Sequence, residues 1–240
     1  MNMNSLDFQP IGYISSCYQE KFGIPRQPGL VTAAKSQLVL SDSFGEESIR
    51  GLGGFSHIWL QFVFHQTQQH GWKSMVRPPR LGGNKKVGVF ASRSTFRPNP
   101  IGLSVVELSG IEINQSKVIL HLLGCDLLNK TPVLDIKPYL HYVDAIPNAV
   151  SGFAPEKPES LIEVMFTDLA MNQCELVNVR LDEDITTLIT QILALDPRPS
   201  YQSNDVDQDR IYRMKLYDFD LSWQYCENNK IKVLALTRSK

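Results

Sequence analysis

The chain has 240 residues and a mass of 27.1 kDa, enough to bury a full hydrophobic core in one large domain, with or without a small appendage. Its 42% hydrophobic and 20% charged residues, with a net charge of -1, are ordinary for a soluble globular protein. No apolar run approaches the roughly 18 to 20 residues of a membrane span, and the polar start lacks a signal-peptide pattern. We therefore expect a cytoplasmic protein without a membrane partner. The four cysteines form no C-x-x-C pair, and no metal site is predicted.

The chain up to residue 139 is predicted to be a succession of strands with few helical patterns. The first strand should be an edge strand because Pro10 and Gly12 lie near its start. The aromatic strand at 55–65 should be central and pair with 86–91, and the polar stretch between them is expected to be a long loop. The succession favours an antiparallel barrel or a strongly bent sheet. Strands are expected at residues 9–16, 36–40, 55–65, 86–91, 101–113, 117–123 and 132–139.

The sequence changes character after a stretch rich in Pro, Gly and Ala at 144–158. A strand at 160–166 is followed by a helix at 182–195, whose acidic start suits the positive end of the helix dipole. Residues 212–225 and 231–236 alternate apolar and polar side chains and predict a hairpin. These patterns predict a small α+β domain.

Positive charge is concentrated in the middle of the chain, where no Asp or Glu occurs between Glu47 and Glu107. This imbalance indicates an anionic partner, while a solvated basic face is the structural alternative. Phe64, Trp72 and Phe96 within the segment could stack on a base or could equally belong to the core, and for Phe64 the core is favoured. The cations and histidines of this acid-free segment are Arg50, Lys73, Arg77, Arg80, Lys85, Lys86, Arg93, Arg97, His57, His65 and His70.

Residues 92–102 form a stiff, polar loop within this segment. Pro98 and Pro100 fix backbone dihedrals and remove two N–H donors. Arginine forks suit carboxylate or phosphate groups, and Asn99 offers a donor and an acceptor to an amide or a base edge. A binding site is therefore favoured over a proline-stiffened barrel corner with solvated arginines. The common hydrolase, phosphate-loop and zinc-protease motifs are absent.

Four stretches carry a family resemblance: 55–59 (Phe-Ser-His-Ile-Trp), 87–104, 126–139, and 196–201 (Asp-Pro-Arg-Pro-Ser-Tyr). With them the chain resembles the TsaA/YaeB family, the TrmO-type tRNA methyltransferases, over most of its length. The resemblance implies a mainly β fold, with a small single-sheet β-barrel in residues 1–158 and a C-terminal α+β domain in residues 159–240. It further implies a homodimer that binds S-adenosylmethionine and methylates N6 of N6-threonylcarbamoyladenosine, the base just 3′ of the tRNA anticodon.

The resemblance also implies which residues contact the cofactor, whereas the substrate contacts are inferred from side-chain chemistry, with Arg97, Arg77 or Arg198 as alternatives for the threonyl carboxylate. The carboxylate and the amine of the methionine part need opposite partners, for which Arg93 and Asp135 are suitable. The threonyl carboxylate of the substrate needs an arginine. The cofactor contacts are predicted at Arg26, Gln27, Pro28, His65, Gln66, Arg93, Leu103, Thr131, Pro132, Val133 and Leu134, and the substrate contacts at Arg77, Arg97, Asn99, Arg198 and Tyr201.

Methyl transfer from a sulfonium to nitrogen is an in-line displacement, in which positioning supplies much of the acceleration. The amide-like N6 is a weak nucleophile until its proton leaves, so a base is useful, and Asp135, Tyr139 and His65 are the candidates. Two rival interpretations stay open: an RNA-binding module without catalysis, and a methyltransferase with another small-molecule or nucleic-acid substrate. The enzymatic interpretation requires Arg93 and the bend at 98–102 to border a cavity.

Overall fold

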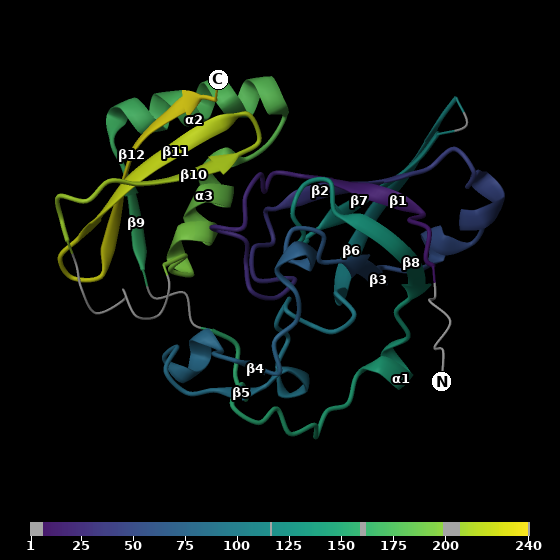
Figure 1. Ribbon diagram of the computed structural model, residues 1–240. Helices are drawn as coiled ribbons and strands as arrows, with labels where there is room; N and C mark the ends of the chain where they lie inside the picture. The colour runs from purple at the N-terminus through teal and green to yellow at the C-terminus, as the bar shows by residue number, and fades with distance from the viewer. Residues whose placement is uncertain (1–6, 116, 159–161, 199–206, 240) are drawn as a thin grey trace.

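A closed barrel of six antiparallel strands dominates the computed structural model, which describes residues 7–115, 117–158, 162–198 and 207–239 (Figure 1). Around the barrel the strands follow the order β1-β2-β7-β6-β3-β8. The expected mainly β fold with a small single-sheet barrel is confirmed. The strand bounds are β1 (Gly12–Ser16), β2 (Lys35–Leu40), β3 (His57–Val63), β6 (Ile101–Asn114), β7 (Lys117–Leu123) and β8 (Pro132–Pro138).

Side chains that alternate along the strands fill the barrel interior. On β3, Ile58, Leu60 and Phe62 are buried, whereas the residues between them are half-buried. Leu38 of β2 and Leu120 of β7 belong to the same buried cluster. A barrel of so few strands is too narrow for anything except its own side chains. A ligand site must therefore be built by the loops.

Two pairing predictions for the barrel are wrong. Residues 86–91 do not pair with β3, because β6 and β8 occupy both of its edges. β5 (Val87–Gly88) pairs instead with β4 (Met75–Val76) in a small ribbon. β1 is not an edge strand, since it pairs with β2 and β8. Pro10 precedes β1, so its missing N–H does not interrupt the barrel ladder.

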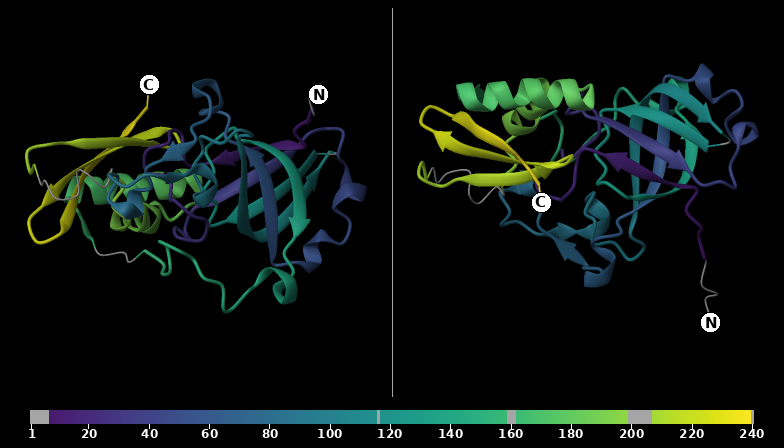
Figure 2. Two further views of the ribbon diagram at one scale, coloured as in Figure 1. Left: turned by 60° about the horizontal axis from the view of Figure 1, so that its bottom comes forward. Right: turned by 90° about the horizontal axis from the view of Figure 1, so that it is seen from above.

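Residues 64–100 leave the barrel between β3 and β6 as an excursion that contains the β4–β5 ribbon (Figures 1 and 2). The base of the excursion is closed by Thr67, whose Oγ1 lies 3.2 Å from Phe64 O and 3.3 Å from Thr95 O. The expected long loop is thus a folded element. Its short 3-10 helices are η3 (Gln68–His70), η4 (Pro79–Leu81) and η5 (Val89–Ala91), and two more, η1 (Glu46–Ile49) and η2 (Leu52–Gly54), connect β2 to β3.

The C-terminal unit, residues 162–198 and 207–239, is a four-stranded sheet with two helices packed against it (Figure 2). The strand order is β10-β11-β12-β9, and β9 is parallel to β12. The expected α+β character is confirmed. No helix in the described residues is long and apolar enough to cross a membrane. The bounds are β9 (Glu163–Phe166), α2 (Asp168–Leu181), α3 (Ile185–Ala194), β10 (Tyr212–Leu216), β11 (Phe219–Cys226) and β12 (Lys230–Arg238).

Two features of this unit differ from the sequence prediction. The helix α2 was not expected, because it buries only Ala170 and Cys174 while Leu176 and Val179 are exposed, which leaves no clear apolar face. The predicted hairpin is a three-stranded meander, because a tight turn separates β10 from β11. Tyr217 adopts a φ of +48° in that turn, and no Gly or Pro marks it in the sequence.

A short helix, α1 (His141–Asp144), follows the barrel and is fastened to its wall by one carboxylate. Asp144 Oδ2 accepts hydrogen bonds from Leu140 N at 2.9 Å and from Trp59 Nε1 at 3.0 Å. Both hydrogen bonds lower the pKa of the Asp144 carboxyl, because they favour its charged form. The chain therefore leaves the barrel at a fixed point beside Trp59.

Gly102 tests how tightly the barrel is packed. It pairs with Phe62 across the β3–β6 ladder, and a Cβ on Gly102 would lie 2.3 Å from Phe62 Cζ. We expect Gly102→Ala to lower the free energy of unfolding by about 1–3 kcal/mol, because a buried ring must move. Gly110→Ala on the same strand is the control, since its Cβ would meet nothing closer than 3.8 Å. Equal losses for the two variants in urea unfolding would contradict this packing.

Candidate functional site

The antiparallel order gathers six strand termini at one end of the barrel, which we call the loop end. The connection from β1 to β2, the segments after β3 and before β6, and the turn from β7 to β8 meet there, because each strand reverses the direction of its neighbour. The residues of the predicted cofactor set lie in these segments or at the strand starts that follow them: Arg26, Gln27, Pro28, His65, Gln66, Arg93, Leu103, Thr131, Pro132, Val133 and Leu134.

A side-chain contact joins two of these segments. Arg93 donates a hydrogen bond from Nη1 to Gln27 Oε1. The loop that carries Gln27 is held in turn by Gly29, whose N–H donates to Gly124 O at 2.8 Å. Gly124 has a φ of +66°, and a Cβ there would lie 3.2 Å from Gly29 Cα. The structure thus brings Arg93 and Gln27 together through a close approach that requires glycine.

Asp126 joins this group. The sequence motif at 126–139 contains both carboxylates, and Asp135 is the one predicted to pair with the amine of the cofactor. Ser104, a buried residue of β6, donates from Oγ to Asp126 Oδ1 at 2.8 Å. Burial raises the pKa of the Asp126 carboxyl to about 6, against the Ser104 hydrogen bond and the charge of Arg93, which both lower it. A desolvated carboxyl beside an arginine is typical of functional sites.

His65 lies just beyond the end of β3 and is half-buried. Burial lowers the pKa of its imidazole, and the charge of Lys21 lowers it further, against a hydrogen bond to Val63 that raises it. A histidine with a lowered pKa is neutral at pH 7 and can accept a proton. Lys21 belongs to the β1–β2 connection, so His65 also lies at the loop end.

Residues at the start of β8 offer few free polar groups. Thr131 is buried, and its Oγ1 donates to Leu128 O at 2.7 Å. Val133 is buried in the barrel core. Pro132 and Leu134 are half-buried, so they offer apolar surface and backbone rather than charge.

Arg97 mainly holds its own loop. Its Nη1 donates to Ser92 O at 2.9 Å and to Val89 O at 3.2 Å, and its guanidinium lies 5.7 Å from the centroid of the Phe90 ring. Asn99 and Arg77, by contrast, are exposed. Of the predicted substrate residues, these two are presented to solvent.

Of the predicted catalytic residues, Asp135 lies on β8 three residues after its loop-end start, and Tyr139 directly follows the other end of the strand. Asp135 pairs with Lys137 at 2.5 Å, and both side chains are largely exposed. Tyr139 N donates to His57 O, at the far end of the barrel. At about 3.3 Å per residue, the strand separates Tyr139 from its loop-end start by roughly 20 Å. The structure therefore does not bring Tyr139 and Arg93 together within one chain.

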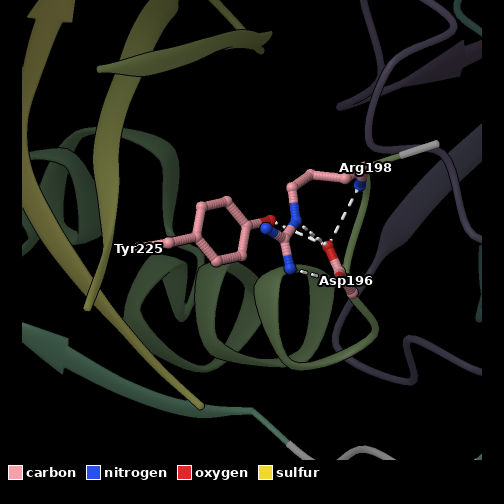
Figure 3. A network of polar contacts seen from close by, with 3 residues as sticks. All are labelled: Asp196, Arg198 and Tyr225. Carbon is pink, nitrogen blue, oxygen red and sulfur yellow. Dashed lines mark hydrogen bonds and ion pairs between the residues drawn. The ribbon is translucent and has the colours of Figure 1, made fainter. Parts of the chain in front are cut away.

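Arg198 is held in a closed network of the C-terminal unit (Figure 3). It is only 5% exposed and donates from Nε and Nη2 to the two oxygens of Asp196, each at 2.9 Å. Tyr225 Oη donates to Asp196 Oδ1 at 2.9 Å, and the guanidinium lies 3.6 Å from the Tyr225 ring centroid. The structure thus buries Arg198 and pairs Nε and Nη2 with Asp196, whereas Nη1 makes no hydrogen bond in the described residues. Tyr201 lies outside the described residues.

The cations of the acid-free segment are almost all exposed and lack acidic partners. Arg97 is half-buried, and the other seven are exposed. Within the described part of the chain, only Arg50 reaches a carboxylate, that of Glu47 at 3.8 Å. Most of these charges lie on the excursion beside the loop end. This surface therefore has an uncompensated positive potential.

Two surface cavities lie elsewhere on the molecule. One of about 870 Å³ lies between the barrel wall and the C-terminal unit, and its lining includes Lys35, His121 and Glu183. The other, of about 390 Å³, lies beside Arg198. Among the described residues, neither lining includes Arg93 or the bend at 98–102. The requirement that this bend border a cavity is therefore not met by either of them within one chain.

One end of the narrow barrel carries guanidinium, amide and carboxyl groups and lies beside a basic excursion. The chain is therefore a β-barrel protein whose loop end is suited to hold a small zwitterion next to a polyanion. The sequence profile of the tRNA-methyltransferase O N-terminal domain matches residues 13–145. The profile of the TrmO C-terminal domain matches residues 159–239. The chain belongs to the tRNA-methyltransferase O (TrmO) family.

Similarity to known members extends over nearly the whole chain. The tRNA (adenine(37)-N6)-methyltransferase of Escherichia coli K12 is 45% identical over 223 residues, which are 92% of this chain and 94% of the relative. A Pseudomonas aeruginosa relative whose name assigns it to the S-adenosylmethionine-dependent methyltransferases is 47% identical over 226 residues, 94% of this chain and 95% of its own. A crystal structure of TrmO from P. aeruginosa matches with a TM-score of 0.82 at 40% identity and covers 99% of both chains.

The raised pKa of Asp126 predicts a pH dependence of stability. The folded protein keeps this proton up to about pH 6, whereas an unfolded Asp loses it near pH 4, so the folded state binds more protons between these values. Stability should therefore fall by about 3 kcal/mol as the pH rises through this window, and stay level above it. Asp126→Asn keeps an acceptor for Ser104 and removes the charge, so it should abolish this fall. Urea unfolding at several pH values measures the difference, and a variant with the wild-type pH profile would contradict the assignment.

Proposed function

We propose that this chain is an S-adenosylmethionine-dependent tRNA methyltransferase that methylates N6 of N6-threonylcarbamoyladenosine at position 37. The observation that carries the proposal is the whole-length similarity to a tRNA (adenine(37)-N6)-methyltransferase. The loop end supports it by gathering Arg93, Gln27 and Asp126 in one place. The threonylcarbamoyl group follows from the family resemblance, and exposed arginines beside the loop end suit its carboxylate.

The loop-end residues fit the chemistry of the proposed cofactor. Arg93 would hold the carboxylate of the methionine part, and Asp126 its ammonium group, since opposite charges at hydrogen-bond distance make strong pairs. Asp126 takes this role in place of Asp135, whose carboxylate faces Lys137 on the outer wall. When bound, S-adenosylmethionine supplies the methyl group on a sulfonium centre. The other predicted cofactor contacts at the loop end are also proposed to bind S-adenosylmethionine.

The chain has to position the acceptor nitrogen and remove its proton. His65 is the proposed base, because its imidazole is half-buried, has a lowered pKa and lies at the loop end. An imidazole nitrogen of His65 would take the N6 proton as the new bond forms. Tyr139 could act at this site only from a second copy of the chain, because it lies at the other end of the barrel. Asp135 remains an alternative candidate for the base.

The acid-free excursion is the proposed surface for the anticodon stem-loop. Its exposed cations suit backbone phosphates. Trp72 is 57% exposed and Phe90 77% exposed, so their rings are available to stack on unpaired bases, whereas Phe64 packs against the barrel core as expected. Arg77 and Asn99 are the proposed contacts to the modified base.

A homodimer is part of the proposal, because neither of the two cavities described above is lined by Arg93. The stretch after β8 supplies apolar surface for a second copy, with Tyr142 83% and Ile146 69% exposed. We further infer two functional units, residues 1–158 and 159–240, which the two family profiles support. The proposed location is the cytoplasm, where the tRNA substrate is available.

The proposed activity is tested with labelled S-adenosylmethionine and two tRNA preparations, one bearing and one lacking the threonylcarbamoyl group. We expect label only in the modified tRNA, and digestion should release a single labelled nucleoside methylated on N6. Label in both preparations would still support methylation of adenine N6, but it would contradict the requirement for the threonylcarbamoyl group. Cofactor binding without transfer to any tRNA would favour another substrate, and tight RNA binding without cofactor binding would favour the RNA-binding module.

The salt dependence of tRNA binding tests the role of the excursion. Arg80 on η4 is exposed. Arg80→Ala should reduce the slope of log Kd against log salt concentration by about the amount that one phosphate contact contributes. Arg50→Ala is the matched control, because Arg50 is exposed but lies near Glu47 outside the excursion. Filter binding at several salt concentrations measures both slopes. An equal change in the two variants would contradict a specific tRNA surface on the excursion.

A further inference from the structure

The β1–β2 connection, residues 17–34, packs into the hydrophobic core of the C-terminal unit and not into the barrel core. Phe22 stacks on Trp223, with ring centroids 5.9 Å apart and an interplanar angle of 10°. This connection is also the segment that carries Arg26, Gln27 and Pro28 to the loop end. Its residues in the C-terminal core cluster are Cys17, Tyr18, Val31 and Ala34, all at most 1% exposed.

Before the cofactor segment, the connection is fixed by backbone contacts to the β10–β11 hairpin. Tyr217 N donates to Cys17 O at 2.8 Å. Gly23 has a φ of +87°, and a Cβ on it would lie 2.8 Å from Met214 Sδ. The chain therefore passes directly over the core of the C-terminal unit just before it reaches Arg26.

After the cofactor segment, the connection is fixed by one side chain of α3. Gln191 Oε1 accepts a hydrogen bond from Ala33 N at 2.9 Å, and Gln191 Nε2 donates to Thr32 Oγ1 at 3.1 Å. Residues 26–28 thus lie between the contact of Gly23 with the C-terminal unit and the hydrogen bond from Gly29 N to Gly124 O of the barrel, and Gln191 fixes the connection again at residues 32–33. Residues 26–28 have no strand pairing of their own that would hold them.

We propose that the C-terminal unit positions the cofactor segment Arg26–Pro28, with Gln191 as a positioning residue. The inference rests on the proposed function for the role of that segment. A loop held in its binding conformation before the ligand arrives does not lose conformational entropy on binding. Loosening an anchor should therefore weaken cofactor binding without changing a group that touches the cofactor.

The test compares Gln191→Ala with Gln173→Ala in the full-length protein. Gln173 Oε1 accepts from Leu236 N at 2.8 Å, so both variants remove a helix-borne acceptor of a backbone N–H, and Gln191→Ala also removes the side-chain contact to Thr32. Both glutamines are half-buried. Gln173 contacts the sheet of the C-terminal unit, whereas Gln191 contacts the β1–β2 connection. The two should lower the melting temperature by similar amounts.

Only Gln191→Ala should raise the Kd for S-adenosylmethionine, by about three- to tenfold, as expected for the loss of a hydrogen bond to a backbone N–H. Its KM for the cofactor should rise in parallel, while kcat at saturation stays within about twofold. Gln191→Glu keeps an acceptor oxygen and should restore the affinity. Amide hydrogen exchange should be faster at residues 26–34 in Gln191→Ala and unchanged there in Gln173→Ala.

Equal cofactor affinity in the two alanine variants would overturn the proposal. Equal exchange rates at residues 26–34 would overturn it as well, whatever the cofactor results, because exchange reports on the loop itself. If the wild-type protein bound no S-adenosylmethionine, the proposed function itself would be wrong. In that case the exchange comparison still decides whether the C-terminal unit holds this loop.

Discussion

Closure of the six-stranded antiparallel ladder is the constraint on which the rest of the structure depends. It satisfies both edges of every barrel strand, so no strand is left open for pairing. It also leaves an interior that side chains such as Leu60 and Leu120 fill completely. A ligand therefore has to bind to the loops, and antiparallel alternation places the loops that carry Gln27, Arg93 and Asp126 at the same end.

The charged groups at that end are in an electrostatically unfavourable environment. Asp126 is ionised at a desolvation cost, which the hydrogen bond from Ser104 and the charge of Arg93 offset only in part, because the pKa of its carboxyl stays raised. The excursion next to it carries exposed cations that repel one another and that form no ion pair with a carboxylate in the described part of the chain. Both features are unfavourable for the isolated protein, and a cationic group at Asp126 and a polyanion on the excursion would relieve them.

The Asp196–Arg198 segment shows why a motif residue need not be a ligand contact. Arg198 is an arginine in a distinctive proline-rich motif, and its residue type suits an anion. In the fold its charge is instead satisfied by a bidentate pair with Asp196 and by stacking on Tyr225. Burial of a guanidinium is costly unless it is paired, and here the ion pair and the ring satisfy Nε and Nη2 but leave Nη1 without a hydrogen bond in the described residues. The network thereby fixes the chain just after α3, the helix that also carries Gln191.

The sequence by itself determined the strands, since alternation with a period of two is a local property of residues such as those at 55–65 and 117–123. It also determined the family, because four motifs in order cover most of the chain, and it showed that positive charge is concentrated between Glu47 and Glu107. It did not determine strand partners, so 86–91 was paired wrongly, nor α2, whose apolar residues are divided between the core and the solvent. Only the tertiary structure showed that Asp126 is desolvated beside Arg93, that Tyr139 lies at the opposite end, and that the β1–β2 connection belongs to the C-terminal core. The physical reason is that pairing, burial and electrostatic proximity depend on which distant segments meet, and closure of the barrel decides that.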